Sequence, residues 1–290
     1  MKNPKFVNAG GIKTRYFEVG SGEPLVLVHG GQPGSVEAHA LDWEPTFDKF
    51  AQGFHVYAID KIGQGHTDNP KRDVDYMIGS SVQHLHDFLK ALRLPGAHVV
   101  GHSRGGYTVC RLALEHPEMV KCVVTVDSGS LMIPRAKFYD DMEPKVALIQ
   151  DPRERSRQHL ALNSFSGAHI TEEYLDAIME ISRLPKTQEA VKKMDLKSPL
   201  WKQFLKDLDA RREETHAWIR KGGLKSPTLI VWAYNDPSAT ADVVGRAAMN
   251  LIFPSNPRTQ MHVLNEAGHY CFREQPAAFV GAVTSFIQTS

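Results

Sequence analysis

Val99-Val100-Gly101-His102-Ser103-Arg104-Gly105-Gly106-Tyr107 is the stretch of sequence that decides the fold. Small and apolar residues lead into Gly-x-Ser-x-Gly, and a helix-compatible run from Thr108 to Glu115 follows at once. Flanking glycines allow a backbone angle and a close approach of strand to helix that a side chain would block. The pattern therefore predicts a strand, a sharp turn with Ser103 at its apex, and a helix, which together form a nucleophile elbow.

Strand-like and helix-like segments alternate on both sides of this stretch. Apolar runs predict strands at 12–19, 24–28, 54–59, 98–100 and 122–126, and amphipathic runs predict helices at 41–50, 82–92 and 108–116. Such alternation predicts an α/β fold with a mainly parallel central sheet and helices on both faces. Ligands of such sheets bind beyond the carboxyl ends of the strands.

The alternation stops between residues 131 and 224. Four helical runs, 135–149, 152–162, 172–181 and 201–221, occupy this region, and no strand pattern stands out. We interpret it as a helical lid inserted into a core domain that comprises residues 1–130 and 225–290. The alternative is a solvated appendage without a part in catalysis. Strands at 227–233 and 260–264 and helices at 239–251 and 276–287 then restore the α/β pattern.

Composition limits the classes of partner. The 290 residues include 34 basic and 33 acidic side chains, a net charge of +1, so we expect neither nucleic acid nor a membrane as partner. Cys110, Cys122 and Cys271 lack the spacing of a metal site or redox motif, which favours a reducing compartment. The first ten residues contain no apolar run typical of a signal peptide. We expect a cytoplasmic protein that acts on a small molecule without metal or cofactor, and a homo-oligomer remains open.

The chemistry of the serine requires a base. A serine hydroxyl is a weak nucleophile until a histidine within hydrogen-bond reach takes its proton. Of the 14 histidines, His269 is the best candidate, because it follows the last predicted strand at the sheet edge that carries the elbow. We expect His29 to support its own loop and His102 to point away from the site.

In their order, the elbow, the His29-Gly30-Gly31 loop, the helical insertion and the late Gly268-His269 pair make the sequence similar to the α/β-hydrolase superfamily over nearly its whole length. The resemblance implies a catalytic acid after a strand. Asp236 stands where most members carry it, and Asp127 stands where some dehalogenase-like members do; we favour Asp236.

An oxyanion hole typically consists of two backbone N–H groups, one of them from the residue after the nucleophile. We therefore expect the N–H groups of Gly31 and Arg104 in this role. The remaining substrate contacts are predicted at Gly30, Tyr107, Tyr270 and the Arg104 side chain.

Within the superfamily, His29-Gly30-Gly31-Gln32-Pro33-Gly34 resembles the corresponding loop of meta-cleavage product hydrolases, which cut a carbon–carbon bond in 2-hydroxy-6-oxo-dienoates. Lid segments 171–175 and 182–185 are similar as well. Three positions depart from that pattern. His102 replaces an asparagine, Tyr270 replaces a tryptophan, and Ile178 stands where a lid arginine holds the substrate carboxylate.

The elbow itself resembles that of haloacetate dehalogenases and epoxide hydrolases, whose nucleophile is aspartate. A serine alkylated at carbon would be a dead-end ether, so Ser103 disfavours both reactions. In the haloacetate enzymes the arginine after the nucleophile holds a carboxylate, which suggests the same role for Arg104. The alternative is an internal pair between Arg104 and an acid such as Asp127.

These observations predict a serine hydrolase of a small carbonyl compound. Carbon–carbon hydrolysis of a dienoate stands slightly ahead of ester or lactone hydrolysis. A ligand-binding receptor of the same fold with little turnover is the alternative from another class.

Overall fold

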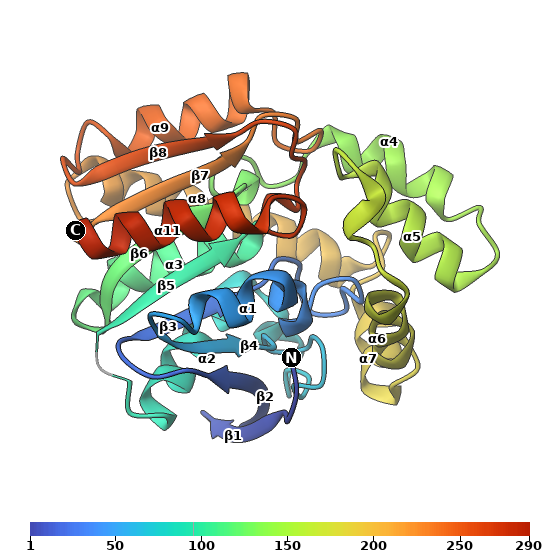
Figure 1. Cartoon of the computed structure of the whole chain (residues 1–290). Helices are drawn as coiled ribbons and strands as arrows, with labels where there is room; N and C mark the ends of the chain where they lie inside the picture. The colour runs from blue at the N-terminus through green and yellow to red at the C-terminus, as the bar shows by residue number, and fades with distance from the viewer. Residues whose placement is uncertain (95) are drawn as a thin grey trace.

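The computed structural model describes residues 1–94 and 96–290 and contains one eight-stranded sheet (Figure 1). The strands are β1 (Lys5–Ala9), β2 (Ile12–Val19), β3 (Pro24–Val28), β4 (His55–Ile59), β5 (Ala97–His102), β6 (Val120–Val126), β7 (Thr228–Ala233) and β8 (Thr259–Leu264). Their order in the sheet is β1-β2-β4-β3-β5-β6-β7-β8. The β1–β2 and β2–β4 pairs are antiparallel, and the pairs from β4 to β8 are parallel. The prediction of a mainly parallel α/β sheet is confirmed.

Two hydrophobic cores lie on the two faces of this sheet. Successive side chains of a strand point to opposite faces, so Val26 and Val28 of β3 join one core, whereas Leu25 and Leu27 join the other. All four are fully buried. The continuous apolar runs of the central strands therefore serve two cores at once, as expected for a sheet covered on both sides.

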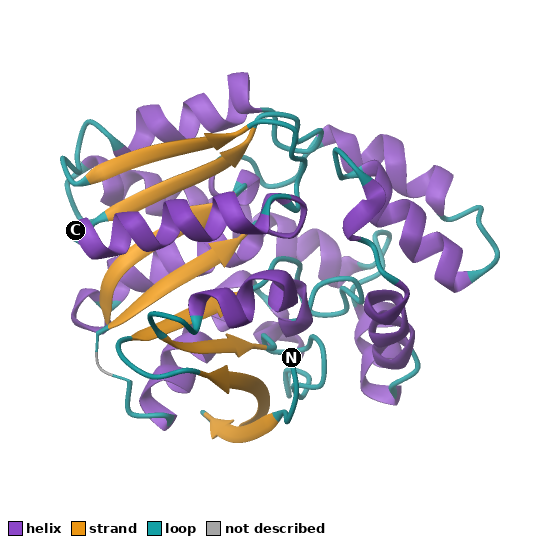
Figure 2. Ribbon diagram, in the orientation of Figure 1, coloured by secondary structure: helices purple, strands orange, loops and turns teal. Residues whose placement is uncertain are grey.

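Helices cover both faces (Figure 2). The first core includes residues of α2 (Ile78–Ala91), α3 (Arg104–Glu115), α8 (Pro199–Arg220) and α9 (Arg246–Ile252). The second core includes residues of α1 (Glu44–Phe50), α10 (Cys271–Glu274) and α11 (Pro276–Thr289). Both ends of the elbow are thus held between packed layers.

Between β6 and β7 the described chain forms helices and no strand. They are α4 (Lys137–Val146), α5 (Pro152–Leu162), α6 (Glu172–Ser182), α7 (Pro185–Lys193) and α8. Helices α4 to α7 stand beyond the carboxyl ends of the strands in Figure 1. Helix α8 packs against α2, α3 and α9, so the end of the inserted region is part of the core. The sequence patterns missed α7 and the edge strand β1.

The elbow is a point of close packing. Ser103 has a φ of 53°, which a residue with a side chain seldom adopts. A Cβ atom on Gly101 would lie 2.2 Å from the carbonyl oxygen of Gly105, and one on Gly105 would lie 2.3 Å from the carbonyl oxygen of Val28. Backbone atoms cannot move aside as a flexible side chain can. Both glycines are therefore required for α3 to start directly at the end of β5.

Replacement of Gly105 by alanine tests this packing. We expect Gly105→Ala to lower the free energy of unfolding by roughly 3 kcal/mol, the upper part of the range for overpacking. Gly281 in α11 is a matched control, because a Cβ atom added there would have no neighbouring atom within 4 Å. Gly281→Ala should stabilise the fold by up to roughly 1 kcal/mol, the helix preference of alanine. Denaturant unfolding measures both, and equal stability of the two variants would contradict the close packing at the elbow.

Candidate active site

Ser103 lies at the apex of the turn between β5 and α3. Its N–H donates to the carbonyl of Val126 over 2.8 Å, and its carbonyl accepts from the Gly106 N–H and the Ser128 hydroxyl at 2.9 and 2.8 Å. These three bonds fix the backbone of the serine against β6 and α3. The strained conformation is thus held by its surroundings, as is typical of functional sites.

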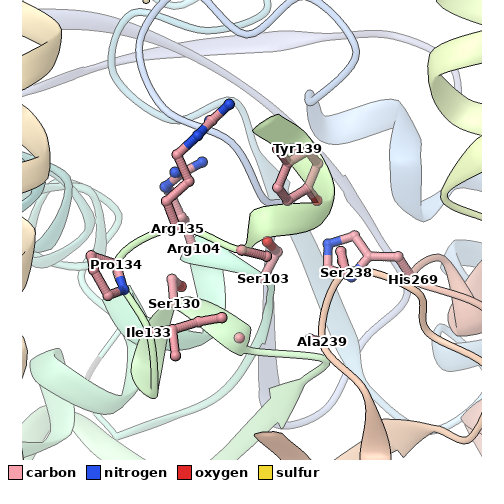
Figure 3. Close-up of a pocket in the computed structure, with 12 residues that line it drawn as sticks. Ser103, Arg104, Ser130, Ile133, Pro134, Arg135, Tyr139, Ser238, Ala239 and His269 are labelled. Atoms are coloured by element: carbon pink, nitrogen blue, oxygen red, sulfur yellow. The ribbon is translucent and has the colours of Figure 1, made fainter. Parts of the chain in front are cut away.

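His269 follows β8 and lies close to Ser103 on the wall of the same cavity (Figure 3). Its Nδ1–H donates to Oδ2 of Asp236 over 2.7 Å. The hydroxyl of Ser238 lies 3.2 Å from the same nitrogen. Nδ1 is therefore occupied, and Nε2 remains as the ring nitrogen that can take a proton from a nucleophile.

Asp236 is buried and held at both carboxylate oxygens. Oδ1 accepts from the N–H and hydroxyl of Ser238, at 2.7 and 2.8 Å, and from the Ala239 N–H at 3.0 Å. Burial acts to raise the pKa of Asp236, but the charge of His269 and these hydrogen bonds keep it below its usual value. Ser238, which no sequence motif marks, thus orients the carboxylate that faces the histidine.

Asp127 occupies a different environment at the end of β6. Its Oδ1 accepts from the Ala233 N–H over 2.7 Å, and Oδ2 makes no hydrogen bond within the described residues. Burial, and next the charge of Asp236, raise the pKa of Asp127 well above its ordinary value. Two buried carboxyl groups this close favour one shared negative charge, and it resides on Asp236. Of the two candidate acids, only Asp236 is hydrogen-bonded to His269 in the described structure.

The two histidines near the elbow differ in outcome. His29 is buried and uses both ring nitrogens on the backbone, since it donates to the Gly30 carbonyl and accepts from the Lys61 N–H. It supports its loop, as predicted. The expectation that His102 points away is wrong. His102 lines the cavity, and its Nε2–H donates to the backbone carbonyl of His269 over 2.8 Å, because the strand ends here and its side chain turns toward the β8 loop.

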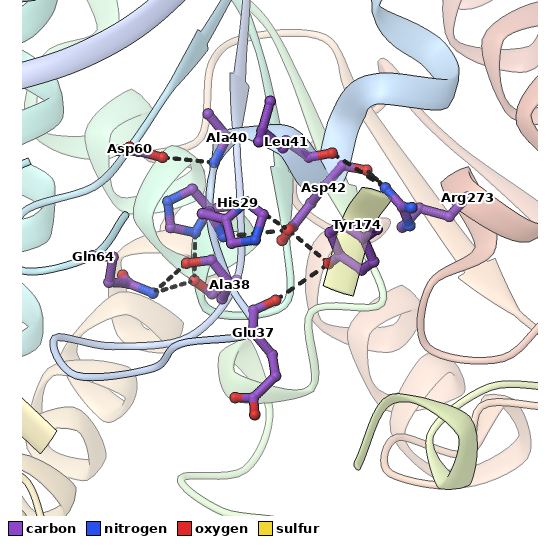
Figure 4. A network of polar contacts seen from close by, with 12 residues as sticks. His29, Glu37, Ala38, Ala40, Leu41, Asp42, Asp60, Gln64, Tyr174 and Arg273 are labelled. Carbon is purple, nitrogen blue, oxygen red and sulfur yellow. Dashed lines mark hydrogen bonds and ion pairs between the residues drawn. The ribbon is translucent and has the colours of Figure 1, made fainter. Parts of the chain in front are cut away.

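The two proposed oxyanion donors are free. Neither the N–H of Gly31 nor that of Arg104, the first residue of α3, donates a hydrogen bond within the described residues. Gly31 has a φ of 68°, which glycine adopts without strain. The buried Lys61 ammonium donates to the Gly31 carbonyl over 2.8 Å, and Gln64 donates to the Gly30 carbonyl over 3.2 Å (Figure 4). The loop after β4 thus fixes the loop after β3, a link that sequence patterns do not reveal.

Two adjoining cavities open at Ser103 and His269, with volumes of about 40 and 280 Å³. Both are also lined by Arg104, Arg135 and Tyr139. The larger one reaches under the inserted helices and includes Gly30, Gly31, Glu37, Asp42, His159, Trp201 and Tyr270 in its wall. Two predicted contacts, Gly30 and Tyr270, therefore lie in the wall.

Tyr107 does not line either cavity. It is fully buried in the core, and its hydroxyl lies 3.3 Å from that of Thr215 on α8. The helical turn after Ser103 carries its side chain away from the site, so we do not retain Tyr107 as a substrate contact. Ile178, at the position of the lid arginine in the resembling family, is also fully buried in the second core.

The Arg104 side chain reaches the cavity without an acidic partner. Its Nη1 donates to Oε1 of Gln32 over 2.5 Å, and its guanidinium carbon lies 5.8 and 5.5 Å from the ring centres of Trp201 and Phe204. Nε makes no hydrogen bond within the described residues. Burial lowers the pKa of Arg104 to about 10, so it remains a cation at neutral pH. The pair with Asp127 that we considered as an alternative does not form.

Metal ligands and membrane-spanning segments do not stand out in this molecule. Residues 1–94 and 96–290 contain no group of three or more histidine, cysteine, aspartate or glutamate side chains placed to hold a metal ion. No helix in the described part of the chain has the length and apolar character needed to cross a membrane. Cys110, Cys122 and Cys271 are buried free thiols.

The fold and this arrangement define a hydrolase of the α/β type. The family model for the alpha/beta hydrolase fold matches residues 23–276, and the chain belongs to that family. Comparison with characterised proteins then narrows the branch.

The chain is 30% identical to the 2-hydroxy-6-oxo-6-(2'-aminophenyl)hexa-2,4-dienoic acid hydrolase of Metapseudomonas resinovorans, over 98% of this chain and 90% of that protein. It is 29% identical to the 2-hydroxy-6-oxo-2,4-heptadienoate hydrolase of Pseudomonas putida, over 98% and 95% of the two chains. The crystal structure of the meta-cleavage product hydrolase CumD superposes with a TM-score of 0.80 at 26% identity and covers 99% of this chain and 98% of that one. The resemblance inferred from the sequence is confirmed.

Paired substitutions test the assignment of the acid. We expect Asp236→Asn to reduce kcat by on the order of 10⁴-fold, because the amide cannot hold the same histidine tautomer. Asp127→Asn should change kcat by less than about tenfold, because a protonated carboxyl group and an amide differ little in charge. Hydrolysis of p-nitrophenyl acetate by both purified variants measures this. Full activity of Asp236→Asn together with loss in Asp127→Asn would reverse the assignment.

Proposed function

We propose that this protein hydrolyses the carbon–carbon bond next to the 6-oxo group of a 2-hydroxy-6-oxo-dienoate. Ser103 is the nucleophile, His269 the base and Asp236 its acidic partner. The observation that carries the proposal is the joint position of Ser103 and of the His269–Asp236 pair on one cavity, in a chain whose relatives are named as dienoate hydrolases.

The reaction follows from these positions. The dienol first shifts to its keto form, with a proton added at the carbon next to the 6-oxo group. Ser103 Oγ then attacks the 6-oxo carbon as His269 takes the hydroxyl proton, and the N–H groups of Gly31 and Arg104 stabilise the resulting oxyanion. The carbon–carbon bond breaks, its electron pair stays on the dienoate fragment, and His269 returns the proton there. Water then attacks the acyl-serine and releases the second product as an acid.

The Arg104 side chain supplies the anchor for the substrate carboxylate. Two nitrogens, Nε and Nη2, make no hydrogen bond within the described residues, and a carboxylate can accept from both at once. Ile178 offers no charge at the lid position. Arg135 also lines the cavity, but Asp140 and Glu143 already pair with it at 2.7 and 2.5 Å.

Helices α4 to α7 serve as the lid that keeps water from the acyl intermediate. We place the enzyme in the cytoplasm, where buried free thiols such as Cys110, Cys122 and Cys271 remain reduced.

Loss of the nucleophile separates an enzyme from a binding protein. We expect wild-type protein to bleach the coloured 6-phenyl dienoate, 2-hydroxy-6-oxo-6-phenylhexa-2,4-dienoate, and Ser103→Ala to bind it without cleavage. The absorbance of the dienoate follows both. A wild-type protein that binds the dienoate without consuming it would instead favour a receptor.

Arg104→Leu tests the carboxylate anchor. We expect a loss of on the order of 10²-fold in kcat/KM for the dienoate, equivalent to about 2.7 kcal/mol for a charge-assisted hydrogen-bond pair. Hydrolysis of p-nitrophenyl acetate, which carries no carboxylate, should change by less than about threefold and provides the internal control. An equal loss on both substrates would remove the anchor and assign Arg104 a structural role.

A further inference from the structure

The cavity wall carries a second charged feature, away from Arg104. Asp42 lies in a short helical turn, Ala40–Trp43, after the oxyanion loop, and lines the larger cavity although only 1% of its surface is exposed. Its Oδ1 accepts from the Tyr174 hydroxyl at 2.9 Å and the His39 N–H at 3.3 Å. Its Oδ2 accepts no hydrogen bond within the described residues. A buried carboxylate oxygen without a donor costs free energy that a ligand donor would recover.

The nearest cation does not satisfy this oxygen. Arg273 stacks on the Tyr174 ring at 3.8 Å, but its Nη1 donates to the backbone carbonyls of Leu41 and Asp42 and its Nη2 to that of His169 (Figure 4). Burial raises the pKa of Asp42 to about 7, against the opposing effects of Arg273 and Tyr174. The carboxylate is thus kept next to the cavity without a salt bridge.

Two more polar side chains of the same cavity lack partners. Glu37 uses one carboxylate oxygen, Oε1, to accept from the Ser156 hydroxyl at 3.0 Å, and its other oxygen makes no hydrogen bond within the described residues. In Figure 4 its side chain extends away from the network around Asp42. The buried Nδ1 of His159 on α5 also has no partner in the described part of the chain. We call Glu37, Asp42 and His159 the acceptor wall.

We propose that the acceptor wall binds a hydrogen-bond donor, an aromatic amine or hydroxyl group, on the substituent of the reacting carbonyl. The substrate is then bifunctional, with its carboxylate on Arg104 and its donor on the acceptor wall. This inference rests on the proposed function for its orientation along the cavity. No sequence pattern signals it, because Asp42 stands in a segment without a motif.

A pair of ketones that differ by one amino group tests the acceptor wall without the dienoate. We expect 2-aminoacetophenone to bind the Ser103→Ala protein on the order of tenfold more tightly than acetophenone, the gain of about one charge-assisted hydrogen bond. Asp42→Asn in the same background should abolish this preference. Asp176→Asn is the matched control, since it removes an exposed acid of α6 that pairs with Arg153, and it should retain the preference.

Calorimetry at about pH 8, where Asp42 is mostly ionised, measures these affinities. Equal affinity for the two ketones, no binding of either, or a preference that survives Asp42→Asn would overturn the inference. If Asp42→Asn fails to fold, Glu37→Gln replaces it, with a smaller loss of preference expected.

Turnover separates this inference from the proposed function. We expect wild-type kcat/KM to be on the order of tenfold higher for the 6-(2'-aminophenyl) dienoate than for the 6-phenyl dienoate, and nearly equal for both in Asp42→Asn. Failure to cleave either dienoate, with the ketone preference intact, would reject the proposed function and leave the acceptor wall in place. Equal cleavage of both by the wild type would do the reverse.

Discussion

The strained backbone of Ser103 is the constraint on which the rest of the structure depends. A φ of 53° is maintained because the Ser103 N–H is bonded to β6, its carbonyl is bonded to Gly106 and Ser128, and the glycines on either side allow contact with β3. This geometry lifts the hydroxyl above the carboxyl ends of the strands. There the loops after β3, β4, β7 and β8 converge, so every other group of the site is positioned relative to this turn.

Electrostatics then divides the roles of two similar side chains. Asp127 and Asp236 follow neighbouring parallel strands and are both buried. Asp236 receives three donors at one oxygen and His269 at the other, whereas Asp127 receives one backbone N–H. The negative charge follows the donors. The same principle polarises the cavity, since Arg104 lacks an acid and Asp42 lacks a cation at its free oxygen within the described residues.

Local patterns predicted the fold because its determinants are local. Apolar runs and glycine positions located β3, β5, β7 and the elbow, and α5 was predicted to the residue at 152–162. The exposed edge strand β1 and the polar α7 were missed, since neither has a strong apolar pattern. Ser103, His269 and both candidate acids follow from strand ends. The contacts of Asp42, Lys61 and His102 join segments distant in the sequence, and the error for His102 arose from treating strand alternation as continuing past the strand end.

The central claim is that water cleaves a carbon–carbon bond at the 6-oxo carbon through Ser103. The most direct measurement is mass spectrometry of the products formed from the 6-phenyl dienoate in water enriched in heavy oxygen. We predict one heavy oxygen in the benzoate product and none from the water in the newly broken end of the dienoate fragment. Unchanged dienoate, or heavy oxygen bound at that end of the dienoate fragment, would contradict the claim.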